Sequence, residues 1–289
     1  MKKWIQLTRP KTLLTGLAPV ILAYGHLLNQ EKIIDNKLCI LTVICVILLQ
    51  VGSNLANDLY DGIRGIDSDE RLGPRRSISK GDITPKTLKV ITFLVFISAF
   101  LIGTIISFYS GFEIFLIGFL SLIVAFAYTG GPYPLSYFAL GELLAFIFFG
   151  SVAVCGVYFI QDKSITTHLF LASFMPGFFS AALMSLNNYR DIYTDKKTQK
   201  KTIAIYLGEV KSKYLTILFI ILGTMTGYFF NSNTQISTLI LPTILSILSI
   251  FFIYKTPHSE KLNKGLGLIS ITNFIWCLSF LLTSWITNA

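Results

Sequence analysis

Nine long apolar stretches dominate this sequence, and they limit what it can fold into more than any other feature. A helix needs roughly 20 mostly apolar residues to cross a bilayer. The stretches do not alternate polar and apolar residues as β-barrel strands do, so each is predicted to be a transmembrane helix. The predicted helices cover residues 12–29, 38–57, 88–109, 112–129, 139–160, 166–188, 213–230, 236–254 and 267–287. We therefore expect an all-α, polytopic membrane protein with nine transmembrane helices.

The composition agrees with this reading. Of the 289 residues, 53% are hydrophobic and 13% are charged, whereas soluble domains carry about 25% charged residues. The net charge of +9 is shared by many nucleic-acid-binding proteins, but here the basic residues lie between the apolar stretches, so topology explains them and no nucleic acid is expected as a partner. Cys39, Cys45, Cys155 and Cys277 lie in apolar stretches without CxxC spacing, which predicts buried thiols.

The distribution of Lys and Arg predicts the orientation in the membrane. Nine helices with a cytoplasmic N-terminus place residues 1–11, 58–87, 130–138, 189–212 and 255–266 on the cytoplasmic side. Together with Lys89 and Lys213 at adjoining helix ends, these segments hold 21 of the 24 Lys and Arg residues. Only Lys32, Lys37 and Lys163 lie elsewhere. Because basic residues concentrate on the cytoplasmic side, we expect a plasma-membrane protein with the N-terminus inside and the C-terminus outside.

A polar stripe lies at the cytoplasmic end of the second predicted helix, in the segment SNLANDLYDGIRGIDSDERLGPRRSISKGD. At 100° per residue, Asn54, Asp58 and Asp61 fall within about 60° of one another on a helix. Two carboxylates one turn apart repel each other, so a positive partner must compensate them. A divalent cation is a suitable partner, since Mg²⁺ takes one or two carboxylates plus phosphate oxygens.

The same pattern recurs 133 residues later, in SLNNYRDIYTDKKTQKKT at the end of the sixth predicted helix. Asn187, Asp191 and Asp195 stand at i, i+4 and i+8 and form a second stripe at the same face of the membrane. We expect one transmembrane domain over 1–289, with an internal repeat of predicted helices 1–4 and 5–8. Sites often lie at the interface between such repeats.

The two stripes together predict a site for metal ions and a diphosphate at the cytoplasmic end. Asp58, Asp61, Asp191 and Asp195 are the candidate Mg²⁺ ligands. Basic residues beside metals neutralise the charge that builds up on a leaving diphosphate. The candidates for that role are Arg9, Arg64, Arg71, Arg76, Lys80, Arg190, Lys200 and Lys201.

The motifs NDLYD and NNYRDIYTD resemble the two Asp-rich motifs of the UbiA superfamily of membrane prenyltransferases. The longer run NLANDLYDGIRGIDSDERLGPRR is similar to the branch that prenylates 1,4-dihydroxy-2-naphthoate in menaquinone synthesis. The segments LTRPKTL, YTGGPYPLSYFALGE, NNYRD and KKTIAIYLG resemble that branch in the same order. The resemblance covers most of the chain and includes the number of helices.

This resemblance implies a function and a set of site residues. The chain is expected to use Mg²⁺ to transfer a polyprenyl group from polyprenyl diphosphate to 1,4-dihydroxy-2-naphthoate, with loss of diphosphate and CO₂, giving demethylmenaquinol. Tyr128 is implied to lie beside the allylic carbon as it ionises, and Arg9 to touch the diphosphate. The implied substrate-binding residues are Arg9, Asn54, Asn57, Arg64, Arg76, Lys80, Glu142, Asn187, Asn188, Arg190, Lys200 and Lys201.

Some residues depart from the family pattern. Gly65 stands where many superfamily members have a third Asp, although the naphthoate branch also tends to have Gly there. Gln199 occupies a position that is commonly Gly, and Ile78 and Ser79 replace the expected Met and Gln. These departures lie in loops that shape the aromatic pocket, so they bear on the acceptor more than on the reaction class.

Other functions remain open on the sequence alone. A UbiA-type enzyme with another aromatic acceptor, such as 4-hydroxybenzoate or homogentisate, fits the same motifs. A secondary transporter of an anionic metabolite fits the repeat and the basic loops, but its site should lie near the midplane. A CDP-alcohol phosphotransferase does not fit, because DGIRG places Arg64 two residues too early for a DGxxAR motif. Glu142, at the start of the fifth predicted helix, is interpreted either as a favourable helix N-terminal acid or as an acceptor-binding residue.

Overall fold

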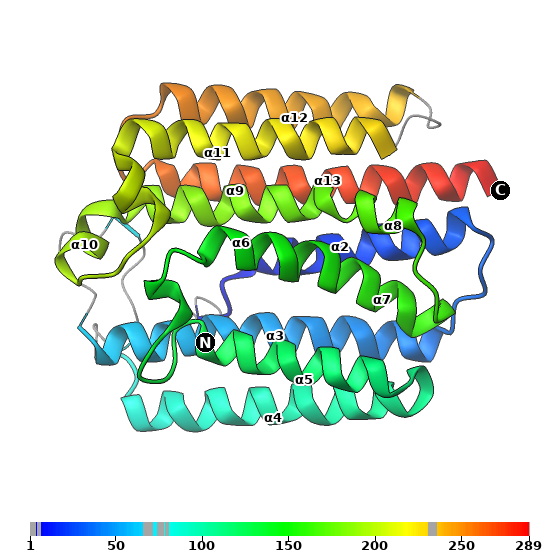
Figure 1. Ribbon diagram of the computed structural model, residues 1–289, viewed down its shortest axis with the longest axis horizontal. Helices are drawn as coiled ribbons and strands as arrows, with labels where there is room; N and C mark the ends of the chain where they lie inside the picture. Colours follow the sequence, from blue (N-terminus) through cyan, green and yellow to red (C-terminus); the bar gives the residue numbers. More distant parts are fainter. Residues whose placement is uncertain are drawn as a thin grey trace.

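The computed structural model describes residues 4, 7–65, 72, 73, 78, 81–230 and 236–288, and this part of the chain is helical. The long helices lie side by side along roughly one common axis, and α10 lies at one end of the bundle (Figure 1). They are α2 (Pro10–Asn29), α3 (Asn36–Ile63), α4 (Pro85–Ser110), α5 (Phe112–Ala127), η1 (Leu135–Tyr137), α6 (Gly141–Phe146), η2 (Ile147–Val152), α7 (Ala153–Asp162), α8 (Thr167–Ala172), α9 (Phe174–Arg190), α10 (Ile192–Lys197), α11 (Ile203–Phe230), α12 (Ile236–Lys255) and α13 (Leu262–Asn288).

The predicted membrane helices are confirmed, although one of them is shorter than a membrane span. Among the described residues, eight helices are long and apolar enough to cross a membrane, and α6, η2 and α7 together form one of them. The stretch predicted as a span at 112–129 is the apolar helix α5, of 16 residues. At 1.5 Å per residue it measures about 24 Å, less than the roughly 30 Å hydrocarbon core of a bilayer. The left-handed backbone of Gly111, at φ 112°, separates α5 from α4 and fixes its start.

Local sequence signals explain where the helices begin and bend. The Asp35 side chain caps α3 by accepting from the backbone N–H groups of Lys37 and Leu38, and Thr84 caps α4 ahead of Pro85. Such caps satisfy N–H groups that have no partner within the helix. The helix predicted from 213 starts earlier, at Ile203, and bends at Gly208, whose φ of 76° suits glycine.

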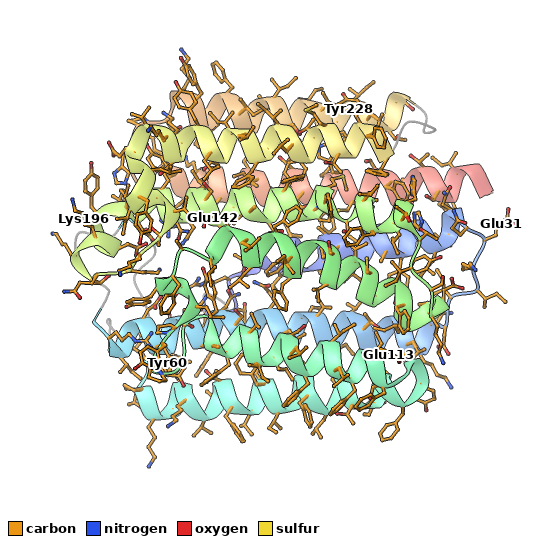
Figure 2. The ribbon with its side chains drawn as sticks, in the orientation of Figure 1. Glu31, Tyr60, Glu113, Glu142, Lys196 and Tyr228 are labelled. Atoms are coloured by element: carbon orange, nitrogen blue, oxygen red, sulfur yellow. The ribbon has the colours of Figure 1, made fainter. Side chains whose placement is uncertain are left out.

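The bundle keeps its outer surface apolar, as a bilayer requires. Large exposed side chains include Phe93 and Phe108 on α4, Met225 on α11 and Phe251 on α12. Charged residues gather at the two ends: Figure 2 shows Lys196 and Glu142 toward one end, with Glu31 and Glu113 toward the other. All four cysteines are unpaired thiols; Cys155 and Cys277 are buried as predicted, whereas Cys39 and Cys45 are half-buried. The chain is therefore a multi-pass membrane protein.

Helices α9 and η2 approach so closely that glycine is required at their contact. A Cβ built on Gly150 would lie 2.9 Å from the carbonyl oxygen of Ser173 and 3.0 Å from the Cα of Gly177. Residues Ile147–Val152 form a π-helix at this contact, with an i→i+5 pattern that often occurs at functional sites. This contact holds the segment formed by α6, η2 and α7 against α9.

We expect Gly150→Ala to destabilise the fold by about 1–3 kcal/mol, because the added methyl has no room to enter. Gly156→Ala, in the same α6–η2–α7 segment, is the matched control, because a Cβ built there meets nothing within 4 Å. Thermal unfolding in detergent should show a lower midpoint for the first variant only. Equal midpoints for both variants would contradict the close contact.

Candidate active site

A cavity of about 390 Å³ lies between α3, α5, the α6–η2–α7 segment and α9. Its wall on α3 reaches from Asp61 to Thr42, a distance of about 28 Å at 1.5 Å per residue. The Asp61 end is polar, whereas Ile106, Ile114 and Ile160 line the other end. The cavity is therefore a long apolar space with one charged mouth.

Both predicted motifs contribute to the polar mouth, although they are far apart in the sequence. Its charged and amide side chains are Arg9, Asn54, Asn57, Asp61, Asn187, Asn188, Asp191, Asp195 and Lys200. Asp61 and Asp195 are 4% and 3% exposed. Buried carboxylates need a positive partner or hydrogen bonds, so their concentration here marks a site for cationic groups.

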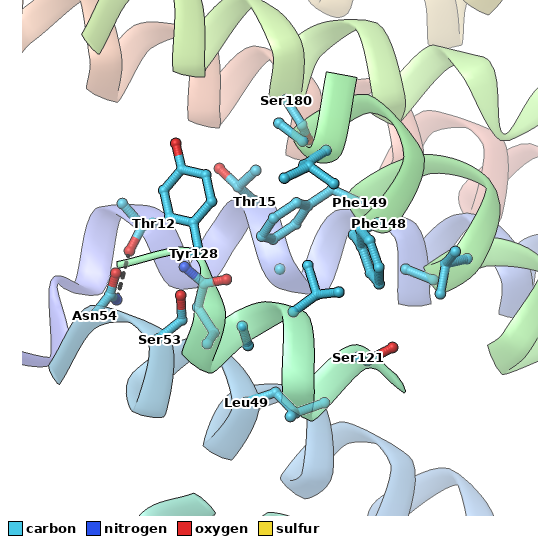
Figure 3. Close-up of a pocket in the computed structure, with 18 of the residues that line it drawn as sticks. Thr12, Thr15, Leu49, Ser53, Asn54, Ser121, Tyr128, Phe148, Phe149 and Ser180 are labelled. Carbon is cyan, nitrogen blue, oxygen red and sulfur yellow. Dashed lines mark hydrogen bonds between the residues drawn. The ribbon is translucent and has the colours of Figure 1, made fainter. Parts of the chain in front are cut away.

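Two asparagines have their amide nitrogens occupied by the protein. Asn54 Nδ2 donates to Thr8 O and Thr12 Oγ1, both at 3.0 Å; the contact with Thr12 is visible in Figure 3. Asn188 Nδ2 donates to Glu142 Oε1 at 3.0 Å. In both residues the amide oxygen remains for the cavity, and an amide oxygen is a suitable ligand for a hard cation.

The other two asparagines are held the opposite way round. Asn57 Oδ1 accepts from Thr129 Oγ1 at 2.8 Å, and Asn187 Oδ1 accepts from Arg190 Nη2 at 2.8 Å. Their NH₂ groups therefore remain as donors. The mouth combines oxygens that suit a metal with N–H groups that suit an anion.

The two stripes differ from the regular helices expected from the sequence. Asp58 is 5% exposed but does not line the cavity, whereas Asn57 on the same turn does. In the second motif, α9 ends at Arg190 and α10 begins at Ile192, so Asp191 lies at a break with φ −93° and ψ 10°. The backbone bond from Asp195 N to Asp191 O, at 2.8 Å, still holds the two acids one turn apart.

The predicted basic residues separate into three groups. Arg9 and Lys200 line the cavity, and Lys200 Nζ lies 3.6 Å from Asp195 Oδ1. Arg64, Arg190 and Lys201 do not line it. Arg71, Arg76 and Lys80 lie outside the described residues.

Arg190 pairs with an acid of the site instead of facing the cavity. Its Nε donates to Asp191 Oδ1 at 2.7 Å and its Nη2 to Asp191 Oδ2 at 2.6 Å. Arg190 is 4% exposed, so this is a buried two-point contact of the strong kind. Arg190 therefore orients Asp191, and a direct contact with substrate is not what the geometry favours.

Arg64 likewise supports the site from outside. Its Nη1 and Nη2 donate to the carbonyl oxygens of Thr129 and Gly131, at 2.5 and 2.7 Å. The guanidinium also lies 5.8 Å from the ring centroids of Tyr60 and Tyr137. Arg64 thus fastens the loop that follows Tyr128 to the end of α3.

The loop from Thr198 to Thr202, which follows α10, contains Gln199, one of the departures noted in the sequence. Gln199 adopts a left-handed backbone at φ 57°, where glycine is favoured. This turn brings the carbonyl of Lys201 to within 2.7 Å of Ala139 N. The loops after α5 and α10 therefore meet beside the mouth.

Tyr128 stands at the boundary between the polar mouth and the apolar length of the cavity. Its ring, labelled in Figure 3, extends from the end of α5 toward Met184 on α9. Its hydroxyl donates to Met184 Sδ at 3.2 Å. Desolvation raises the pKa of Tyr128, and the nearby carboxylates Glu142, Asp195 and Asp61 raise it further. The phenol therefore stays protonated and neutral.

The donor set fits a magnesium ion that shares its ligands with a diphosphate. Among the described residues, no group of three or more His, Cys, Asp or Glu side chains is gathered tightly enough to hold a metal alone. The mouth offers carboxylate and amide oxygens, the ligand type that Mg²⁺ prefers, and Mg²⁺ commonly takes one or two carboxylates plus phosphate oxygens. The residues that would hold it are Asp61, Asp191 and Asp195, with Asn54.

Several residues of the cavity were not predicted from the sequence. Gln50 and Ser53 on α3, Thr12 on α2 and Ser180 on α9 all line it. Gln50 had a usable signal, because it lies one turn before Asn54 inside an apolar span, and polar residues within spans mark functional sites. Ser53, Thr12 and Ser180 carry no such signal, since Ser and Thr are common in membrane helices.

The sequence matches known proteins over nearly its whole length. Residues 16–284 match the model of the UbiA prenyltransferase family. A 1,4-dihydroxy-2-naphthoate octaprenyltransferase of Haemophilus influenzae is 32% identical over 95% of this chain and 93% of that protein. The enzymes of the same name from Escherichia coli and Bacillus subtilis are 34% and 35% identical over 73% and 70% of this chain, and over 70% and 65% of their own lengths.

Solved structures share the fold at lower identity. A UbiA homolog from Aeropyrum pernix superposes with a TM-score of 0.70 at 15% identity, covering 93% of this chain and 97% of the other. A UbiA homolog from Archaeoglobus fulgidus, bound to GPP and Mg²⁺, gives 0.68 at 15% identity, covering 96% and 99%. At this identity the likeness shows a common architecture.

Proposed function

The chain belongs to the UbiA prenyltransferase family, and we propose that it transfers a polyprenyl group from a polyprenyl diphosphate to 1,4-dihydroxy-2-naphthoate. Diphosphate and CO₂ leave, and demethylmenaquinol is the product. The observation that carries this proposal is the shape of the cavity, which joins a mouth of carboxylates, amides and basic groups to a long apolar space. This combination suits a molecule with a diphosphate head and a hydrocarbon tail.

The head group is recognised at the polar mouth. Arg9 and Lys200 supply positive charge, and the NH₂ groups of Asn57 and Asn187 donate to phosphate oxygens. Asp61, Asp191 and Asp195, with Asp58 one helical turn away on α3, would hold a Mg²⁺ ion, which would neutralise charge on the leaving diphosphate. These groups stabilise the departing anion more than the bound substrate, which is how they lower the barrier.

The tail lies along the apolar part of the cavity, where Phe148 and Phe149 of the π-helix form part of the wall (Figure 3). When the C–O bond breaks, the allylic carbon becomes cationic beside Tyr128. An aromatic face attracts a cation, and the neutral phenol offers no anionic oxygen to trap it. The apolar walls exclude water that would otherwise quench the cation.

The acceptor is held next to Tyr128, where Glu142 and Asn188 meet. Glu142 is 3% exposed and lies behind Asn188 without lining the cavity itself, and its Oε2 has no hydrogen-bond partner among the described residues. Such a buried oxygen is suited to accept a hydrogen bond from a hydroxyl group of the acceptor. The electron-rich ring attacks the allylic carbon through its own carbon, a C–C bond forms, and the ring loses CO₂ and a proton.

The mouth faces the cytoplasm in this proposal, because the basic loops surround it and the soluble acceptor must reach it. The opposite end of the cavity is lined by Ile106, Ile114 and Ile160, which speaks against a polar path through the membrane. A transporter of an anion would require such a path.

The experiment that tests the proposal uses purified protein, a labelled polyprenyl diphosphate, Mg²⁺ and separate acceptors. Mass spectrometry should find a prenylated, decarboxylated product with 1,4-dihydroxy-2-naphthoate, and none with 4-hydroxybenzoate or homogentisate. A product with 4-hydroxybenzoate or homogentisate would change the assigned acceptor and leave the proposed prenyl transfer standing. No product with any acceptor, from protein shown to be folded, would overturn the proposed function.

We expect Tyr128→Leu to lower kcat by roughly 30-fold, because a desolvated cation–π contact contributes about 2 kcal/mol or more. Tyr128→Phe should keep most of the activity, since it retains the ring and loses only the contact of the hydroxyl with Met184. Steady-state kinetics of the two variants show whether the ring or the hydroxyl group of Tyr128 is responsible for the rate. A loss in the Phe variant as large as in the Leu variant would assign the role to the hydroxyl instead.

A further inference from the structure

Arg190, which orients Asp191 and Asn187, is itself fixed by a residue of the last helix. Its Nη1 donates to Asn263 Oδ1 at 2.8 Å. Asn263 is the second residue of α13 and lies 68 residues after Asp195, the last acid of the second motif. The hydrogen bonds of this one guanidinium therefore join two cavity-lining side chains to a helix that lies outside the predicted motifs.

Asn263 makes a second contact with a third segment of the chain. Its Nδ2 donates to the carbonyl oxygen of Leu72 at 2.8 Å. Leu72 belongs to the connection between α3 and α4, which follows the first motif. One amide thus links the second motif, through Arg190, to the backbone that follows the first.

The two contacts require a side chain at this position that both accepts and donates, as the Asn263 amide does. A guanidinium can only donate and a backbone carbonyl can only accept, so the partner between them must accept on one side and donate on the other. Aspartate would accept from Arg190 but could not donate to Leu72, and alanine would do neither. The orientation of the Asn263 side chain follows from its partners.

We propose that Asn263 is a positioning residue for the transfer reaction, which holds Arg190 so that Asp191 and Asn187 face the diphosphate site. This inference rests on the proposed function. The Asp191 carboxylate receives both hydrogen bonds of the Arg190 two-point contact, so its direction in the cavity is the direction that Arg190 imposes. Without Asn263, a buried guanidinium hydrogen loses its acceptor, and the side chain must shift to find another.

The contact with Leu72 gives the same side chain a second role. The amide ties the end of α9, through Arg190, and the α3–α4 connection, at Leu72, to α13. The carbonyl of Arg190 is also fixed, by His258 Nε2 at 2.9 Å. Arg190 is thus held both at its backbone carbonyl and at the tip of its side chain, as expected of a residue that orients a metal ligand.

Three variants separate these contacts. Asn263→Ala removes both, and Asn263→Asp keeps the acceptor for Arg190 and removes the donor to Leu72. Lys264→Ala is the matched control, since Lys264 is the next residue of α13 and is exposed.

Binding of geranyl S-thiolodiphosphate, a non-ionising analogue, is measured by calorimetry with Mg²⁺ present. Substitution of groups that orient metal ligands commonly costs about 10- to 100-fold in affinity or activity. We therefore expect Asn263→Ala to bind the analogue at least about tenfold more weakly, Asn263→Asp to lie between it and wild type, and Lys264→Ala to match wild type.

Kinetics provide a readout that a general loss of folding does not produce. The KM for the polyprenyl diphosphate should rise in Asn263→Ala, while the KM for the aromatic acceptor stays unchanged. If the alanine variant fails to fold, Asn263→Leu carries the test, because leucine has a shape close to that of asparagine and removes the acceptor for Arg190.

The outcomes distinguish this inference from the proposed function. Wild-type protein that does not bind the analogue would overturn both. Wild-type binding with equally tight binding by folded Asn263→Ala and Asn263→Asp would overturn the role of Asn263 and leave the proposed function standing. Equal increases in both KM values would also contradict it, because they would indicate a general loosening of the bundle.

Discussion

Asp61→Asn and Asp195→Asn are each expected to lower the transfer rate by about two to three orders of magnitude, the usual cost of removing a group that stabilises developing charge. Both side chains are almost fully buried at the mouth of the cavity, one from each motif. Asparagine keeps their shape and removes the negative charge that holds a cation. Because the cation in turn stabilises the leaving diphosphate, the loss should appear in kcat as well as in the KM for the prenyl diphosphate.

The matched control is Asp82→Asn, an exposed acid on the α3–α4 connection that does not line the cavity. It removes the same charge and should leave both constants unchanged. Thermal unfolding should place all three variants near wild type, which separates lost chemistry from lost structure. If folded Asp61→Asn keeps the kcat of the wild type, the Asp61 carboxylate has no part in the reaction.

The membrane helices were predictable because their signal is long and physical. An apolar run that matches the bilayer leaves the backbone no option but a helix, and most predicted ends lie within a few residues of the observed ones. The clear errors have local causes. The last turns of α3 are too polar to count as a span, yet they remain helical as far as Ile63. The start of α11 at Ile203 was hidden by polar residues on its first turns and by the bend at Gly208.

The candidate site was predictable where a residue and its role lie in one motif. Asn54 and Asp61 share a helix face, so periodicity alone placed them together. Arg64 and Arg190 were expected to bind substrate because their charge suits a diphosphate. Charge does not reveal that Arg64 is engaged by the carbonyls of Thr129 and Gly131, which only the fold brings near. Nor does it reveal that Arg190 turns its guanidinium back onto Asp191, the next residue of the chain.

Asn263 shows the limit of motif reasoning most clearly. It lies in a helix with an ordinary apolar pattern, far from both motifs, and one Asn near a helix start is unremarkable. Its role rests on two tertiary contacts, with Arg190 and with Leu72. Neither contact leaves a trace in local periodicity or spacing, so a single sequence offers no signal for it.

Removal of divalent cations is expected to abolish transfer. Protein dialysed against EDTA should form no product above the uncatalysed background, and added Mg²⁺ should restore the rate. Mn²⁺ accepts the same oxygen ligands and should support part of the activity. Ca²⁺ prefers more ligands at longer distances than Mg²⁺ and should support little.

The arrangement of acids adds a sharper expectation about how the metal binds. Because no group of three or more metal-binding side chains is gathered among the described residues, the protein offers each ion too few ligands to hold it alone. Diphosphate oxygens must supply the rest, so each partner should increase the affinity of the other by the same factor. Mg²⁺ should therefore raise the unfolding temperature strongly when geranyl S-thiolodiphosphate is present, and only weakly without it. An equal rise without the analogue would mean that the carboxylates hold the metal by themselves, and transfer that survives EDTA would mean that they act without one.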